Sequence, residues 1–257
     1  MLIDTHAHLF YPNFADDLTE VIDRAAEAGV DYIIVPGTDL KTSREAVELA
    51  DRFENIYAAV GVHPHDTKEW KEEWLKDLEE LTGTEKVVGI GEIGLDYYYD
   101  FSPKDIQNIA FKDQIDFAID KDLPVVVHNR ESNEDMMKTI RGYEGKKLKA
   151  QFHCFAGSAE DAQELISLGH LISFPGNITF KKQDSLREIV SAIPPEKLMI
   201  ETDSPFMTPV PHRGKRNEPM HVKLVAEQLA EIHSLSFEDA AKITSENAIN
   251  FFGFERH

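Results

Sequence analysis

The chain has 257 residues, 42% of them hydrophobic, and its 47 acidic and 27 basic residues give a formal net charge of −20. This length allows one large α/β barrel or two small domains, and no uncharged apolar run reaches the roughly 18 residues that a membrane helix needs. So acidic a surface repels polyanions and membranes on average, which means that a nucleic-acid substrate would need a local basic patch.

Short runs rich in Val, Ile and Phe alternate along the chain with longer segments of helical periodicity. The predicted strands are residues 2–9, 31–37, 56–64, 87–96, 124–130, 149–155, 170–178 and 198–205. The predicted helices are residues 16–28, 43–53, 69–81, 105–120, 133–143, 159–168, 185–193, 221–233 and 237–252.

Strand–helix alternation predicts a parallel sheet, because parallel neighbours need a crossover connection. Eight repeats of this size favour a (β/α)8 TIM barrel, with a doubly wound open sheet as the alternative. No linker or low-complexity tract divides the chain, so we predict a single domain over residues 1–257. The first six residues lack a basic segment ahead of an apolar one, and Cys154 is the single cysteine, so we expect a cytoplasmic protein. No obligate protein partner is evident.

Residues with metal-binding side chains recur at the carboxyl ends of the predicted strands. They are His6, His8, Glu92, His128, His153 and Asp203. His6 and His8 are two apart, so on a strand they point to the same face. In a (β/α)8 barrel these strand ends meet at one mouth, where active sites lie. Burying such a cluster without compensation is costly, and neutral His with ionised Asp or Glu are natural ligands of a divalent cation.

Six ligands exceed the four of a closed zinc site and suit two divalent ions that share a bridging carboxylate. Glu92, from a middle strand, is the natural bridge. The imidazoles suit Zn or Mn at least as well as Mg, so the residues leave the metal open among these three. Any one of these histidines alone is more often a structural residue, and the convergence of all six indicates the site.

Seven segments carry a wider pattern, in order over essentially the whole chain. They are DTHAH (4–8), GVHPH (61–65), GEIGLD (91–96), VHNR (127–130), HCFAG (153–157), ETDSP (201–205) and PVPHRGKRNEP (209–219). Together they resemble the TatD-type metal-dependent deoxyribonucleases. The resemblance implies a TIM barrel of the amidohydrolase-like superfamily and a Mg-dependent nuclease acting on the 3′ ends of DNA. It also implies one metal held by His6, His8, Glu92 and Asp203, and a second held by Glu92, His128 and His153.

Two metals about 3.5–4 Å apart can activate water, neutralise the phosphoryl oxygens and assist the leaving oxygen. Asp203 would bind one metal and orient the water or take its proton. His63 either contacts a phosphoryl oxygen or protonates the leaving group, or it is a structural strand-end residue. Asp4 and Glu201 should point into the barrel, where they either orient a ligand imidazole or form a buried ion pair. Cys154 should turn outward and pack.

Basic loops at the same mouth could hold the substrate. Arg130 follows the fifth strand with the parity of His128, and barrels often bind phosphate on the loops after strands seven and eight. The basic residues on those two loops are Lys181, Lys182, Arg213, Lys215 and Arg216. A solvated basic loop is the alternative for these. Aromatic residues that could stack on bases, or pack against the helices, are Tyr97, Tyr98, Tyr99 and Phe155.

We therefore expect a metal-dependent hydrolase, specifically a deoxyribonuclease that cleaves DNA from the 3′ end with Glu92, Asp203 and His63 in catalysis. Arg130, Arg213, Lys215 and Arg216 are the residues expected to bind the substrate. The alternative is hydrolysis of a small ester, amide, lactone or phosphotriester, or of an aminoacyl-tRNA ester, at the same metal site. A scaffold with a structural metal is disfavoured, because such sites are usually closed and four-coordinate.

Overall fold

Eight strands and nine helices make up the framework of the computed structural model, which describes residues 1–254. The strands are β1 (Leu2–Asp4), β2 (Val30–Pro36), β3 (Ile56–Val60), β4 (Val87–Asp96), β5 (Val125–Arg130), β6 (Ala150–Phe152), β7 (Leu171–Phe174) and β8 (Leu198–Ile200). The helices are α1 (Leu18–Glu27), α2 (Leu40–Arg52), α3 (Trp74–Leu81), α4 (Lys104–Asp120), α5 (Asn133–Arg141), α6 (Ala159–Ser167), α7 (Asp184–Ala192), α8 (Val222–His233) and α9 (Phe237–Phe252).

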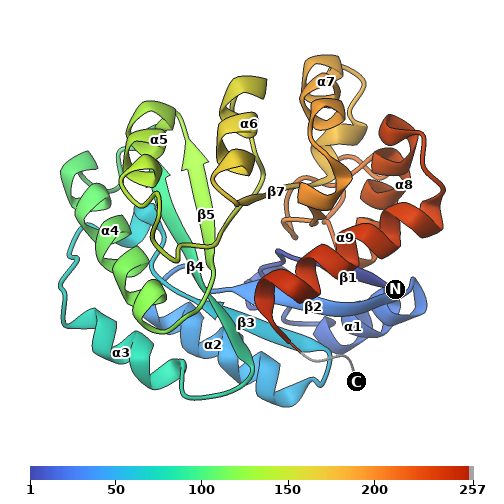
Figure 1. Ribbon diagram of the computed structural model, residues 1–257. Coiled ribbons are helices and arrows are strands. Elements are labelled where there is room, and N and C mark those ends of the chain that lie inside the picture. Colours follow the sequence, from blue (N-terminus) through green and yellow to red (C-terminus); the bar gives the residue numbers. More distant parts are fainter. Residues whose placement is uncertain (255–257) are drawn as a thin grey trace.

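The strands form one sheet in sequence order, and each neighbouring pair is parallel. A parallel bridge between Ala7 and Ser204 joins the segments that follow β1 and β8, which closes the sheet into a barrel. The helices surround it (Figure 1). The fold is therefore a TIM barrel, and the open-sheet alternative is excluded.

Several strands are shorter than their sequence patterns predict. β1 ends at Asp4 instead of residue 9, and β8 ends at Ile200 instead of residue 205. Beyond these points regular strand pairing gives way to isolated backbone bonds and to bonds with side chains, as where Asp4 accepts from the Thr202 amide at 2.9 Å and from the Thr202 hydroxyl at 2.6 Å. The apolar pattern continues into these segments because they too are buried, although they are no longer extended strand.

Helix ends also differ from the predictions. α2 begins at Leu40 instead of residue 43, because Asp39 and Thr42 form a capping box in which each side chain accepts from the other's backbone amide. α3 begins only at Trp74, since residues 69–73 form two turns joined by irregular backbone. Within the described residues, none of the helices combines the length and apolar character needed to cross a bilayer.

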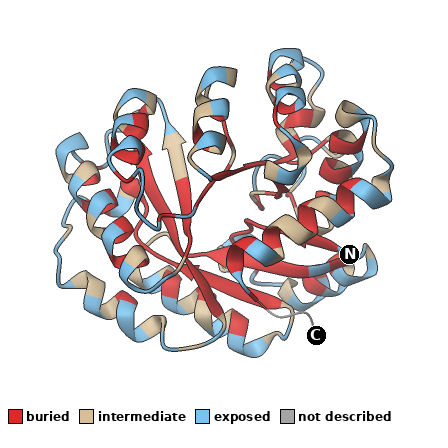
Figure 2. Ribbon diagram, viewed as in Figure 1, coloured by how far each residue is buried: buried red, intermediate tan, exposed pale blue. Residues whose placement is uncertain are grey.

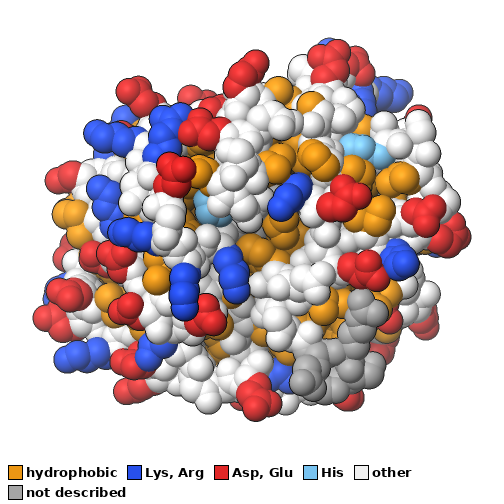
Figure 3. All heavy atoms as spheres, in the orientation of Figure 1, with side chains coloured by type: hydrophobic (Ala, Val, Ile, Leu, Met, Phe, Trp, Pro, Cys, Tyr) orange, Lys and Arg blue, Asp and Glu red, His pale blue; other side chains and the backbone are white. Residues whose placement is uncertain are grey.

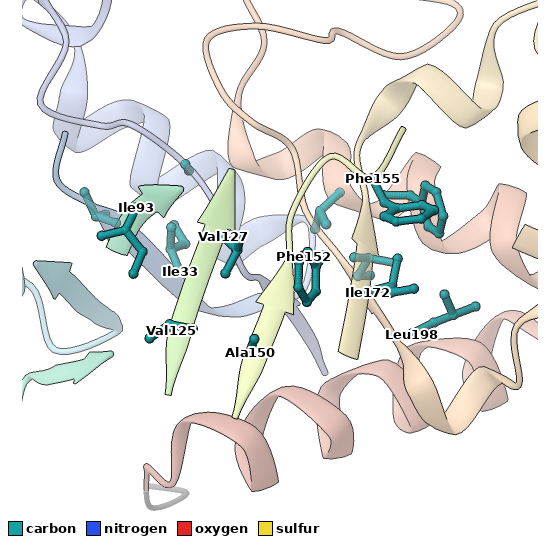
Figure 4. Close-up of a cluster of buried hydrophobic side chains, with 14 of the residues drawn as sticks. Ile33, Ile93, Val125, Val127, Ala150, Phe152, Phe155, Ile172 and Leu198 are labelled. Atoms are coloured by element: carbon teal, nitrogen blue, oxygen red, sulfur yellow. The ribbon is translucent and has the colours of Figure 1, made fainter. Parts of the chain in front are cut away.

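The buried side chains form two apolar layers. The larger one lies between the barrel and its helices and includes Phe152, Val127 and Ile172 from neighbouring strands (Figure 4). Figure 2 shows the strands mostly buried, apart from the carboxyl end of β5, while the helices expose their outer faces. The second layer contains Ile3 and Ile34 together with Phe251, Phe252 and Phe254. α9 and Phe254 thus pack against the barrel strands, away from the loops that follow the carboxyl ends of those strands.

Candidate metal centre

Glu92 lies at the centre of the predicted metal site, on β4, with only 3% of its surface exposed. Its Oε1 atom lies 2.8 Å from His153 Nε2 and 2.9 Å from His128 Nδ1. Its Oε2 atom lies 3.3 Å from His6 Nε2 and 3.5 Å from His8 Nε2. The two carboxylate oxygens therefore face two different pairs of imidazoles.

Asp203 completes the group on the Oε2 side, where its Oδ1 atom lies 3.6 Å from His8 Nε2. The amide of Asp203 donates to the carbonyl of His6 at 2.8 Å, which ties the segments after β8 and β1 together. Asp203 has a left-handed backbone conformation, with φ of 54°, so it lies on a turn and not on a strand. All six predicted ligands are thus brought together, and we call them the Glu92 cluster.

The hydrogen bond of His8 fixes which of its nitrogens is free. His8 Nδ1 lies 3.2 Å from the carbonyl of Pro36, and a carbonyl only accepts, so Nδ1 carries the proton. The lone pair of Nε2 then faces the carboxylates of Glu92 and Asp203 at 3.5 and 3.6 Å. A lone pair and two carboxylates that converge without a proton form an unfavourable arrangement, which a cation between them would relieve.

Two further imidazoles are oriented in the same way. His128 Nε2 lies 3.0 Å from the Asp96 carboxylate, which leaves its Nδ1 directed at Glu92. The Glu201 carboxylate faces His153 Nδ1 at 3.6 Å, which leaves Nε2 directed at Glu92. Outer carboxylates that set the tautomer of a ligand imidazole are typical of metal centres. This donor set fits divalent cations, with a separate group of donors at each oxygen of Glu92.

The pKa values show how strongly these groups interact. Burial opposes ionisation of Glu92, but the surrounding imidazoles outweigh it and hold the pKa of the carboxyl well below its usual range. Burial lowers the pKa of His8 to about 3, with help from His6. For Asp203, burial raises the pKa to about 6. His8 is therefore neutral near pH 7, as a metal ligand must be.

His63 is oriented in the opposite sense to the imidazoles of the Glu92 cluster. Its Nδ1 accepts from the backbone amide of His65 at 3.2 Å, so in the neutral ring Nε2 carries the proton. That Nε2 lies 3.4 Å from Glu92 Oε1. In the neutral ring His63 thus presents an N–H to Glu92 and the cavity, while with Glu92 and His128 it also forms a group whose ligand atoms lie close enough to hold a metal ion.

Asp96 and His65 are functional candidates that the sequence analysis did not single out. Asp96 Oδ2 accepts from His65 Nε2 at 2.8 Å and from His128 Nε2 at 3.0 Å. Burial opposes ionisation of Asp96, but the bonds from His128 and His65 prevail and lower the pKa of its carboxyl. The sequence does indicate Asp96, because it lies on the same predicted strand as Glu92 at an even spacing and so should point to the same face.

The two carboxylates with open roles differ from each other. Glu201 accepts from the Cys154 amide and the Ser173 hydroxyl, both at 2.6 Å, and faces His153, so it orients an imidazole. Within the described residues, Asp4 neither orients a ligand imidazole nor forms a buried ion pair, the two roles expected of it. It accepts from the amides of His6 and Thr202 and so fixes the backbone on which the cluster is built, while burial raises its pKa to about 8.

The outward orientation expected for Cys154 rests on strand alternation, and that argument does not apply. β6 ends at Phe152, and Cys154 has a left-handed φ of 44°. Burial raises the pKa of its thiol, and the charges of Asp203 and Glu201 raise it further, so the thiol is not poised as a nucleophile.

A cavity of about 430 Å³ opens beside the Glu92 cluster. The predicted site residues that line it are His8, His63, Glu92, His128, Arg130, His153 and Asp203. Other lining residues are Tyr11, Thr38, His65, Asp66, Asp96, Tyr99, Phe206 and Met207. Arg130 thus lies at the mouth beside the Glu92 cluster, and its guanidinium is 3.9 Å from the centre of the Tyr98 ring.

The basic loop after β8 is placed differently from the prediction. Arg213, Lys215 and Arg216 are absent from the lining of this cavity. Arg213 stacks on the Phe180 ring at 3.5 Å, and Arg216 forms ion pairs of 2.7 Å with Asp17 and Glu218. The charge of Arg216 is thus already paired within the fold, and its role in holding substrate stays a prediction. The position of a loop directly after Asp203 in the sequence does not determine in which direction the loop runs.

Replacing Arg216 with glutamine should lower the melting temperature by about 2–4 °C, since Asp17 and Glu218 lose a shared partner. Lys215→Gln is the matched control, because it removes the same charge from the neighbouring residue and should leave the melting temperature unchanged. The measurement is thermal unfolding of both variants. An Arg216→Gln variant that melts like the wild type but has a raised KM for DNA would instead assign Arg216 to substrate binding.

The aromatic residues also separate into two groups. Phe155 is buried among apolar side chains (Figure 4), and the Tyr97 hydroxyl donates to Asp135 at 2.6 Å, so both are structural. Tyr98 and Tyr99 are exposed, and Tyr99 lines the cavity. In the view of Figure 3, basic and acidic side chains are intermingled over the visible face, with no large area of one sign.

Comparison with known proteins places the chain among related enzymes. The model of the family described as TatD related DNase matches residues 3–253. The uncharacterized metal-dependent hydrolase YabD of Bacillus subtilis is 47% identical over 98% of this chain and 99% of its own. The 3'-5' ssDNA/RNA exonuclease TatD of Escherichia coli is 33% identical over 98% and 99%. The crystal structure of the TatD homolog YJJV from Escherichia coli superimposes with a TM-score of 0.92, at 30% identity over 99% and 98% of the chains.

Proposed function

This chain belongs to the TatD family of metal-dependent hydrolases, and we propose that it is a deoxyribonuclease that removes nucleotides from the 3′ ends of DNA. The observation that carries the proposal is the buried Glu92 carboxylate, with a different pair of imidazoles at each oxygen. The name of the Escherichia coli TatD protein, an exonuclease at 33% identity, supports the substrate.

Two divalent ions, Mg²⁺, Mn²⁺ or Zn²⁺, fit this donor set. The residues that would hold one are His6, His8, Glu92 and Asp203, and those for the other are Glu92, His128 and His153. When bound, such ions neutralise charge on phosphoryl oxygens and acidify water. Glu92 would serve both ions, while Asp96 and Glu201 would keep the lone pairs of His128 and His153 directed inward.

The remaining steps belong to the side chains of the cavity. Asp203, at the edge of the cavity, accepts the proton of the attacking water. His63 directs an N–H into the same cavity and, kept neutral because burial lowers its pKa to about 4, donates a hydrogen bond to a phosphoryl oxygen or to the leaving oxygen. Arg130 forms no ion pair within residues 1–254, so its charge is available for a phosphate of the strand.

A parallel assay of several substrates tests this function. Single-stranded DNA, duplex DNA, RNA and p-nitrophenyl acetate are each incubated with Mg²⁺, Mn²⁺ or Zn²⁺. We expect 5′-labelled single-stranded DNA to be shortened one nucleotide at a time, and the same strand with a blocked 3′ end to resist. Rapid ester hydrolysis with every nucleic acid left intact would refute the nuclease and favour a small-molecule hydrolase.

A further inference from the structure

Exposed apolar side chains gather around the cavity beside the Glu92 cluster. Among the described residues, seven large hydrophobic side chains are exposed, and five of them lie on the loops after β4 and β8. These five are Tyr98, Tyr99, Phe101, Phe206 and Met207. An apolar group concentrated at one mouth of an acidic protein indicates a binding surface, since isolated exposed apolar residues are ordinarily scattered.

The first wall of this mouth follows β4. Tyr99 is 41% exposed and lines the cavity. Its ring stacks on Phe101, with the centroids 5.2 Å apart and the planes at 22°, and it meets His65 edge-on at 5.4 Å. Asp96 accepts from the backbone amides of Tyr98 and Tyr99, so the carboxylate that orients His128 also positions this wall.

The second wall follows β8. Phe206 is 52% exposed, lines the same cavity and meets Tyr11 edge-on at 6.0 Å. Its amide donates to the Asp203 carbonyl at 2.8 Å, so its position is coupled to the Glu92 cluster. β4 and β8 are four strands apart in a closed barrel of eight, which puts the two walls on opposite sides of the mouth.

A flat, apolar group that is attached to a phosphate matches this arrangement. An unpaired nucleobase can offer its ring faces to the two walls, whereas a paired base, even at the end of a duplex, must first break its pair. The cavity of about 430 Å³ has the size of a small-molecule site, which suits one nucleotide and not a base pair. Arg130, held against Tyr98 at 3.9 Å, places a cation beside the first wall for the adjoining phosphate.

Building on the proposed nuclease function, we propose that Tyr99 and Phe206 form a base-binding subsite that takes an unpaired nucleobase next to the scissile phosphate. The subsite selects single-stranded ends, because only there can a base leave its neighbours without breaking a pair. Its contribution comes from the ring faces, so it is insensitive to which base is present.

The test combines variants of the walls with removal of the base from the substrate. Tyr99→Ala and Phe206→Ala are assayed on a 5′-labelled oligonucleotide and on the same oligonucleotide with abasic residues at its 3′ end. Ile109→Ala, at an exposed apolar residue of α4 outside the cavity, is the matched control. The aromatic replacements Tyr99→Phe and Phe206→Tyr test whether a ring face is sufficient.

For the ordinary end we expect each alanine variant to raise KM by about tenfold, the scale of one lost base stack. The rise in KM on the abasic end should be much smaller, because the wild type makes no base contact there. The aromatic replacements should retain the preference for a base, and Ile109→Ala should behave as the wild type.

Equal losses on the two oligonucleotides, or no loss on either, would overturn the subsite while leaving the nuclease intact, since the wild type would still cut DNA. Equal losses would mean that the walls support the Glu92 cluster or contact another part of the substrate. A wild-type protein that cuts neither oligonucleotide would overturn both proposals together.

Discussion

Replacing Glu92 with glutamine is expected to reduce hydrolysis by more than about a hundredfold. Losing an outer partner of a metal ligand already costs up to about a hundredfold, and Glu92 is proposed to be a ligand itself. Glutamine keeps the shape but removes the charge, and its amide nitrogen cannot bind a cation. Because Glu92 faces both pairs of imidazoles, one substitution should weaken both metal positions. The measurements are kcat on single-stranded DNA and the number of Mn²⁺ ions bound per chain.

The fold of the Glu92→Gln variant is checked separately in metal-free protein. Its circular dichroism should match that of the wild type, because the Glu92 side chain contacts imidazoles and its backbone amide still donates to the Gly37 carbonyl. Full binding of two Mn²⁺ ions, or activity within about twofold of wild type, would show that Glu92 is not the bridge.

The second large effect is expected at Asp203. Asp203→Asn weakens one metal position and removes the group that accepts the proton of water, so we predict a loss in kcat of about a hundredfold or more. KM for DNA should change little, because Asp203 makes no proposed contact with the DNA backbone. The measurement is steady-state kinetics over a range of DNA concentrations.

Asp66→Asn is the matched control for Asp203→Asn. It removes a carboxylate that lines the same cavity but stands outside the Glu92 cluster, so its effect on kcat should be far smaller. If the two substitutions reduced kcat equally, the effect at Asp203 would reflect the general charge of the cavity. The proposal that Asp203 acts as the base would then be refuted.

The order and type of the structural elements could be predicted because apolar periodicity is strong in every strand and most helices. β4 runs over the whole predicted range, whereas β1 and β8 stop early. Where a strand ends depends on where the backbone finds other partners, such as the Asp4 carboxylate with Thr202. Such long-range contacts leave no local pattern in the sequence.

The convergence of the six predicted ligands could also be predicted, since a barrel brings the ends of its strands to one mouth. His6 and His8 do point the same way, as their spacing of two predicts, although both lie beyond the end of β1. Loops were harder to interpret. Arg216 is paired with Asp17, almost two hundred residues away in sequence, and only the folded chain reveals such a partner.

The most direct test of the account is hydrolysis of 5′-labelled single-stranded DNA by protein stripped of metal. The stripped protein is checked by elemental analysis and then titrated with Mn²⁺ or Mg²⁺. The account predicts no cleavage without metal, and recovery that is complete only when two ions are bound per chain. Undiminished cleavage by protein shown to be free of metal would contradict it.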